Sequence, residues 1–204
     1  MLALGPKLGP ILWQLPPNFH FDPGRLAAFL ELLPADTDAA PELARRHEPR
    51  IKDRVWLKRQ PRRRLRHALE IRHESFVTPD FIRLLRAHRV ALVCADTVAW
   101  PMLMDVTSDF VYCRLHGSEE LYASGYDERA LRRWAARIQA WAAGGEPEDA
   151  PHASDRAAAR RKRRDVFLYF DNDRKVRAPA EARRLMELLG MASSADGTRS
   201  APRS

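Results

Sequence analysis

The feature that most constrains the fold is a strand pattern that recurs along the chain and keeps one face wholly apolar. Five short apolar runs are each followed by a turn, and most of them by a helical pattern. They are GPILWQLPP, HALEIRHESF, VALVCADT, DFVYCRLHG and DVFLYFDND. Strands that alternate with helices pair in parallel through right-handed crossovers. The pattern therefore predicts an α/β architecture.

The opposite face of these strands carries polar and ionisable side chains, mostly near the C-terminal ends. Alternate residues of a strand share a face, so Leu69 and Ile71 oppose Glu70 and Arg72. An open sheet with helices on both sides would need two apolar faces. A (β/α) barrel instead has an apolar outside, a packed inside and a polar mouth where the strands end. We therefore predict a TIM-barrel-type fold whose inward face carries Gln14, Glu70, Arg72, Asp96, Arg114, His116 and Asp171.

In the third strand, the same reasoning places Leu92, Cys94 and Asp96 on the inward face. Neighbouring strands lie about 4.8 Å apart, so Arg114 is expected to reach Asp96 or Asp171. Ionised groups inside a barrel are costly unless they are paired. Two interpretations follow: an ion-pair network that holds the interior together, or an anion-binding or acid/base site.

Four amphipathic helices are predicted between and after the strands. They cover residues 24–33, 78–88, 126–143 and 178–190, where apolar residues recur at helical spacing. Thr78 is a suitable N-cap with Pro79 at the first helical position, and Gly144 and Gly190 are suitable stop signals. The segment 36–66 is read as helix and loop, and 143–164 as a low-complexity connection.

The charge favours anionic partners. The net charge is +8 and the pI is about 10.1, which suits phosphates, nucleic acid or acidic metabolites. The basic runs Lys58–Arg66 and Arg160–Arg164 are either solvated surface or phosphate contacts.

Neither a membrane segment nor a signal peptide is expected. No run of eighteen apolar residues occurs, and the N-terminal stretch is broken early by Gly and Pro. We therefore expect a cytoplasmic protein. Cys94 and Cys113 lie in apolar stretches and are predicted to be buried free thiols.

Several motifs together resemble the YecE-like family, also called domain of unknown function 72. They are LGPILWQLPPNFHFDPGRLAAFLELLP, RHALEIRHESF, ADT, DFVYCRLHG, YASGY and YFDND, in the family's order and spacing from about Leu4 to Gly190. The resemblance implies a TIM barrel and does not name a reaction. We expect residues 1–190 to form the barrel domain and residues 191–204 to be a disordered tail.

The sequence departs from the family pattern in two places. Members usually carry a further N-terminal part with the first three strands, so this chain is expected to hold five of eight. The turn after ADT is also shorter than usual. Three explanations of the first departure stay open: a start upstream of Met1, which we expect, completion by another chain or by a second copy through exposed sheet edges, or an inactive truncated fragment.

The polar face supplies the candidate site. Glu70 and His116 are predicted as the acid/base pair, with Asp171 as a third catalytic group. Arg72 and Arg114 are predicted to hold an anionic small molecule. The full set of substrate-binding candidates is Gln14, Arg72, His73, Asp96, Arg114, Tyr126 and Asn172.

Other chemistries are less well supported by the sequence. The potential ligands for a metal show no recognised close spacing, so no metal site is predicted, and no cofactor is assigned. The rival to a small-molecule site is a barrel that binds or processes nucleic acid through its basic runs, with Trp100, Tyr122 and Tyr126 stacking on bases.

Overall fold

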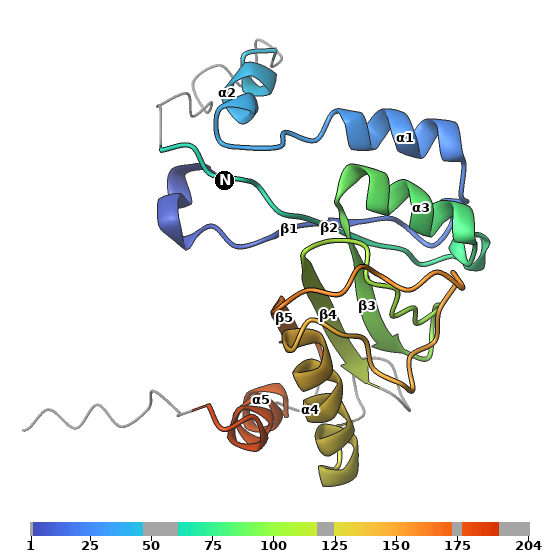
Figure 1. Cartoon of the computed structure of the whole chain (residues 1–204), viewed down its shortest axis with the longest axis vertical. Helices are drawn as coiled ribbons and strands as arrows, with labels where there is room; N and C mark the ends of the chain where they lie inside the picture. Colours follow the sequence, from blue (N-terminus) through green and yellow to red (C-terminus); the bar gives the residue numbers. More distant parts are fainter. Residues whose placement is uncertain (1, 47–60, 118–124, 173–176, 192–204) are drawn as a thin grey trace, which may run out of the picture.

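Five parallel strands form a single sheet in the order in which they occur along the chain. The computed structural model describes residues 2–46, 61–117, 125–172 and 177–191. Within these residues the sheet order is β1-β2-β3-β4-β5 (Figure 1). The five predicted strands and the α/β class are thus confirmed. They are β1 (Ile11–Gln14), β2 (His67–Glu70), β3 (Ala91–Thr97), β4 (Phe110–Gly117) and β5 (Asp165–Phe170).

The sheet is open rather than closed. β1 and β5 are its two edges, and no pairing in the described part of the chain joins them. Each edge strand therefore leaves one row of backbone groups without a strand partner. The five strands are parallel and follow one another in the order expected of a barrel, but the described strands do not close into one.

The predicted helices are confirmed, and their ends carry the expected caps. The Thr78 side chain accepts a hydrogen bond from the Phe81 backbone N–H at 3.3 Å, and Pro79 is the first helical residue. Gly144 and Gly190 follow helix ends with φ of 82° and 69°, a conformation that glycine adopts without strain. The helices are α1 (Pro23–Glu31), α2 (Ala39–Ala44), α3 (Pro79–His88), α4 (Glu128–Ala142) and α5 (Ala178–Leu188); short 3₁₀ turns lie at Leu2–Lys7 and Glu74–Phe76.

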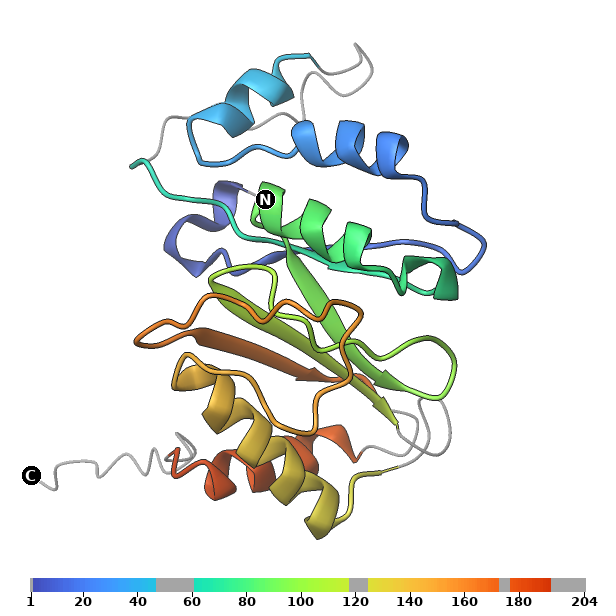
Figure 2. The ribbon, with the colours of Figure 1, turned by 45° about the vertical axis from the view of Figure 1, so that its right-hand side comes forward.

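The helices cover one face of the sheet in two groups. Figures 1 and 2 show α1 beside α3, near β1 and β2, and α5 beside α4, near β5. Leu69 on β2 belongs to a buried cluster with Phe81 and Leu85 of α3. Cys113 on β4 belongs to a second cluster with Trp134 and other residues of α4. The face predicted to be apolar in β2 and β4 is thus the one under the helices.

The other face carries small and aromatic side chains, and within the described residues no helix covers it. Its cluster contains Ala68, Val93, Ala95 and Tyr112, with Phe167 packed against them. Tyr169 of β5 stacks on Tyr112 with ring centroids 5.1 Å apart, and 47% of its surface is exposed. This face therefore has an apolar middle and becomes polar toward the C-terminal ends of the strands.

The face assignment of β3 was wrong. Leu92 and Cys94 pack in the clusters under the helices, whereas Ala91, Val93 and Ala95 line the inner face. Both faces of this strand are apolar. The prediction had assigned the inward face from the position of Asp96 alone, and that one charged residue gave the wrong face. Inward-facing alanines are required because an arginine side chain of β4 passes over β3 to reach β2.

The connection from α4 to β5 is anchored by hydrogen bonds. The buried Asp105 carboxylate accepts backbone N–H groups of Ala153 and Ser154 at 2.8 and 3.2 Å. Arg164, which the sequence left as solvated surface or phosphate contact, is 5% exposed and donates to the carbonyls of Trp141 in the last turn of α4 and of Gly145 beyond its end. Arg164 is therefore a buried residue whose guanidinium is bonded to backbone carbonyls.

Three further expectations can be compared with the structure. Cys94 and Cys113 are buried free thiols, as predicted, and they pair in register on adjacent strands. Among the described helices, none has the length and hydropathy needed to cross a membrane. The tail predicted to be disordered falls outside the described residues from 192 onward, as do Lys58–Gln60 of the first basic run and Tyr122.

Candidate functional site

A buried carboxylate is the centre of the polar network at the carboxyl end of the sheet. Glu70 is the last residue of β2, and none of its surface is exposed. Its Oε1 accepts a hydrogen bond from Arg72 Nε at 2.9 Å, and its Oε2 accepts one from Arg114 at 2.5 Å. A buried charge is stable only when it is paired and hydrogen-bonded, and here two guanidinium groups satisfy that requirement.

Arg114 links three strands and the residue that follows β5. It lies on β4, opposite Ala95 of β3, and its side chain crosses that small residue to reach Glu70 on β2. The same nitrogen donates to Gln14 Oε1 of β1 at 3.0 Å, and the other terminal nitrogen donates to Asp171. The cross-strand pair of Arg114 with Asp171 is therefore formed, and the alternative pair with Asp96 is not.

His116 lies between the two carboxylates and has no exposed surface. Its Nδ1 is 3.1 Å from Asp171 Oδ2, and its Nε2 is 3.9 Å from Glu70 Oε2. Of the three side chains, only that of Asp171 is accessible, at 40% exposed. A ligand that enters from solvent would therefore meet Asp171 first.

Arg72 is held in place by an ion pair on one side and an aromatic ring on the other. Its guanidinium carbon lies 4.2 Å from the centroid of the Trp100 ring, and this ring also meets His116 edge-on at 5.2 Å. Cation–π stacking leaves the in-plane N–H groups of a guanidinium free to donate. Within the described residues, no hydrogen bond uses the two terminal nitrogens of Arg72.

The charges of the network shift one another's protonation. Burial alone would raise the pKa of Glu70, but its contact with His116 and the hydrogen bonds from Arg114 and Arg72 outweigh burial and lower the pKa from 4.5 to about 2. Burial opposes the charge on Arg114 too, yet Glu70 and Asp171 raise its pKa overall. Glu70 is therefore ionised across the physiological range, and it acts as a fixed counter-ion for the two arginines.

Three of the predicted site residues lie outside this network. The Asp96 carboxylate accepts a hydrogen bond from Trp134 Nε1 of α4 at 3.1 Å, on the helix-covered side. Tyr126 is 6% exposed, and its hydroxyl oxygen accepts the Gly117 backbone N–H at 3.1 Å. Asn172 donates to Glu181 of α5 at 2.8 Å. These contacts attach α4, α5 and their loops to the strand ends, which is a structural role.

The remaining predicted residue, His73, caps the 3₁₀ turn that follows β2. Its Nδ1 accepts the Ser75 backbone N–H at 3.1 Å, so the turn itself fixes the ring. The ring centroids of His73 and His20 are 3.9 Å apart. The structure therefore brings Gln14, Glu70, Arg72, Arg114, His116 and Asp171 into one network and leaves His73 beside it.

Trp100 is the residue of the network that sequence reasoning did not assign to it. The sequence suggested it only as a ring that could stack on nucleic-acid bases. The sequence did contain a signal for this contact: Trp100 lies in the loop directly after β3, a strand whose C-terminal end carries the charged Asp96. Among the described residues, no group of three or more His, Cys, Asp or Glu side chains could hold a metal ion.

Comparison with known proteins identifies relatives in fold and sequence. Residues 1–204 match the model of a family described as protein of unknown function DUF72. A crystal structure of a DUF72 family protein from Enterococcus faecalis V583 is 17% identical, with a TM-score of 0.59 over 94% of this chain and 62% of that chain. Another, from Thermotoga maritima MSB8, is 19% identical, with a TM-score of 0.61 over 93% of this chain and 60% of that chain.

The chain thus spans less than two thirds of the length of these solved proteins. Their similarity supports the TIM-barrel-like fold. None of the curated proteins matches the sequence.

Proposed function

The chain belongs to the DUF72 family, in agreement with its YecE-like motifs, and we propose that this member binds a small organic anion at the carboxyl end of its sheet. The ligand class is a carboxylate or a phosphate ester. The observation that carries the proposal is Arg72, whose guanidinium is held by Glu70 and Trp100 while both terminal nitrogens keep their hydrogen-bonding capacity. A planar guanidinium with two parallel N–H donors is suited to bind a carboxylate or phosphate.

The rest of the network supports this role by fixing the arginine in advance. The pair of Glu70 with Arg72 neutralises much of the cost of burying the guanidinium, whose side chain is 14% exposed. A side chain already held in its binding geometry loses little entropy when a ligand arrives. Gln14, which is exposed, and Asp171 border the same region and are the groups available for the polar parts of a ligand.

Proton transfer, if the ligand reacts, is assigned to Asp171 and His116 rather than to Glu70. Glu70 is fully buried and has a pKa of about 2, so it is a poor proton donor near neutral pH. Asp171 is exposed to the ligand and lies 3.1 Å from the imidazole, which would exchange protons with it. The predicted catalytic function of Glu70 becomes an electrostatic one in this proposal.

Binding of nucleic acid has weaker support. Arg164, in the second basic run, is committed to backbone carbonyls, and Tyr126 is buried. Trp100, the third candidate for base stacking among the described residues, lies against Arg72. Each of these side chains already has an internal contact, so we favour the small anion.

The test is a calorimetric titration of the whole chain with malonate and with inorganic phosphate at low ionic strength. We expect saturable binding of at least one of them, and a loss of at least tenfold in affinity, about 1.4 kcal/mol, in Arg72→Gln. Arg72→Lys keeps the charge without the paired donors, so it should bind with intermediate affinity.

The matched control is Arg83→Gln, which changes an exposed arginine on α3 that pairs with Asp80. It should bind as the wild-type chain does. The proposal is wrong if wild type binds neither anion, or if Arg72→Gln and Arg83→Gln bind equally well. Circular dichroism of each variant separates lost binding from lost folding.

A further inference from the structure

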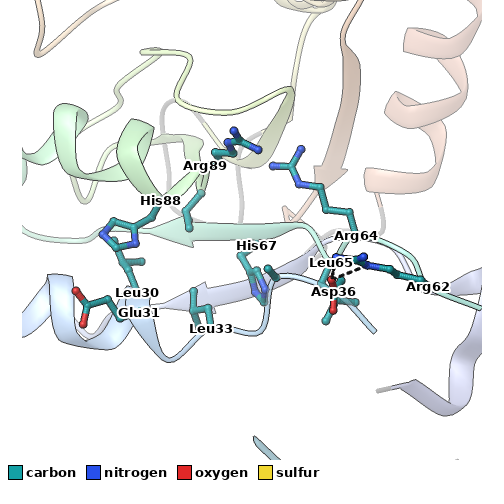
Figure 3. A pocket seen from close by; sticks show the side chains of 12 residues that line it. Leu30, Glu31, Leu33, Asp36, Arg62, Arg64, Leu65, His67, His88 and Arg89 are labelled. Atoms are coloured by element: carbon teal, nitrogen blue, oxygen red, sulfur yellow. Dashed lines mark hydrogen bonds and ion pairs between the residues drawn. The ribbon is translucent and has the colours of Figure 1, made fainter. Parts of the chain in front are cut away.

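A separate cavity lies at the opposite end of the sheet, where the strands begin. Its volume is about 480 Å³, which is within the range of small-molecule sites. Three segments line it: the end of α1 with the chain that follows, the chain that leads into the start of β2, and the end of α3 with its connection to β3 (Figure 3). From this cavity we infer a second ligand site, independent of the proposed function.

The floor of the cavity is apolar and buried. Leu30, Leu65 and Val90 line it and are each no more than 4% exposed. His67 lies among them, and both of its ring nitrogens are engaged. Nδ1 accepts a hydrogen bond from Trp13 Nε1 at 3.1 Å, so Nε2 carries the proton that faces the Pro34 carbonyl at 2.9 Å. This histidine is therefore part of the wall and is not available to a ligand.

The rim carries three arginines and two carboxylates, Glu31 and Asp36, and its arginines differ in their partners. Arg62 pairs with Asp36 at 3.1 Å, and Arg64 pairs with Asp109. For the side chain of Arg89, no hydrogen bond or ion pair occurs within the described residues. In Figure 3 the guanidinium groups of Arg64 and Arg89 lie on the same side of the cavity. An anion between them would satisfy the charge of Arg89.

The backbone at Arg89 has an uncommon conformation for a residue other than glycine. It is the one non-glycine residue with positive φ among those described, at 55°, in the position that ends α3. Glycine adopts this conformation freely, whereas an L-residue is strained there. Strain of this kind is concentrated at ligand sites. The left-handed turn places an exposed guanidinium over the cavity in place of an unstrained glycine.

We propose that this cavity binds a small soluble phosphate ester with an apolar group, through Arg89 and the apolar floor. The phosphate would lie at the rim between Arg89 and Arg64, and the apolar group would cover Leu30, Leu65 and Val90. Neither part alone uses the whole site. A phosphate without an apolar group, or an apolar molecule without a phosphate, should therefore bind much more weakly.

The experiment uses phenyl phosphate as the probe, titrated into the full chain and followed by calorimetry. We expect saturable binding, at least tenfold tighter than that of inorganic phosphate or of phenol. In the Arg72→Gln background, which removes the site at the carboxyl end, Arg89→Gln should weaken phenyl phosphate binding at least tenfold. Arg89→Gly removes the same guanidinium and relieves the strained backbone, so it should lose binding while the chain stays folded.

Two controls separate this site from the one at the carboxyl end. Phenyl phosphate is itself a phosphate ester and can also bind beside Arg72, so one saturable phenyl phosphate site should remain in Arg72→Gln and be lost when Arg89→Gln is added. Arg89→Gln alone should leave malonate binding unchanged. The inference is overturned by the absence of saturable binding, by unchanged binding when Arg89→Gln or Arg89→Gly is added to Arg72→Gln, or by the loss of all phenyl phosphate binding in Arg72→Gln alone.

Discussion

At the scale of single residues, the polar network depends on a carboxylate whose burial is stable because two arginines neutralise its charge. Glu70 lies at 0% exposure and contacts two arginines, so its charge is balanced on both oxygens. The sequence predicted this grouping for Glu70, Arg72 and Arg114, because their parity along the strands was enough to place them on one face. It could not predict Trp100, since the conformation of a loop has no periodicity from which a contact can be read.

Glu70→Gln is expected to destabilise the chain by about 3–5 kcal/mol, because two guanidinium groups would lose a buried counter-ion. Denaturant titrations of wild type and variant would measure this loss. The matched control is Glu42→Gln in the exposed pair with Arg45, for which the change should be within about 0.5 kcal/mol. Equal stability of the Glu70 variant and wild type would contradict the structural role of the network.

The same carboxylate gives a dependence of stability on pH. Its pKa is lowered from 4.5 to about 2 in the folded chain, so its contribution is complete above pH 4.5 and is lost as the pH falls toward 2. The size of that contribution is on the order of 3 kcal/mol. The stability difference between wild type and Glu70→Gln should therefore shrink between pH 5 and pH 2, measured by unfolding at each pH. A constant difference would show that Glu70 has an ordinary pKa.

At the scale of elements, the sequence predicted strands and helices well because their signals are local. The N-cap at Thr78 and the stop at Gly144 involve only neighbouring residues, and both were found. The inward face of β3 was predicted wrongly because it is determined by contacts with other strands. Ala91, Val93 and Ala95 face inward, where the Arg114 side chain of β4 crosses β3. A comparison of side-chain sizes on the two faces, rather than of charge alone, would have found this.

The end of α4 provides a test at this scale. Gly144 has a φ of 82°, and a Cβ there would lie 1.9 Å from the Arg161 carbonyl oxygen. Gly144→Ala should therefore destabilise the chain by at least about 2 kcal/mol, through backbone strain and a clash that only movement of the backbone relieves. At Gly145 a Cβ would lie 3.5 Å from its nearest neighbour, so Gly145→Ala should cost much less. Similar melting temperatures for the two variants would contradict the described turn.

At the scale of the whole molecule, the described part of the chain is an open parallel sheet with helices on one face. The solved DUF72 proteins, of which the chain spans 60% and 62%, support the barrel-like arrangement of these strands. The sequence alone could predict the strand order, because each strand pairs with the next. It could not predict which side chains meet across the sheet. The edges at β1 and β5 remain the proposed surfaces for self-association.

The reactivity of the two cysteine thiols measures how often the folded sheet opens. Cys94 and Cys113 are 2% and 0% exposed, and burial raises the pKa of the Cys113 thiol, so neither should react with a soluble disulfide reagent in the folded chain. Both should react at the rate of global unfolding, and immediately in denaturant. Rapid modification of either thiol under native conditions would mean that the sheet under α4 opens locally.

The most direct test of the central claim is a crystal of the whole chain soaked in selenate, a tetrahedral anion that is located by its anomalous scattering. The account predicts an anomalous peak within hydrogen-bonding distance of the terminal nitrogens of Arg72, absent from crystals of Arg72→Gln. A peak that persists in the Arg72→Gln crystals, or soaked wild-type crystals with no anion beside Arg72, would contradict it.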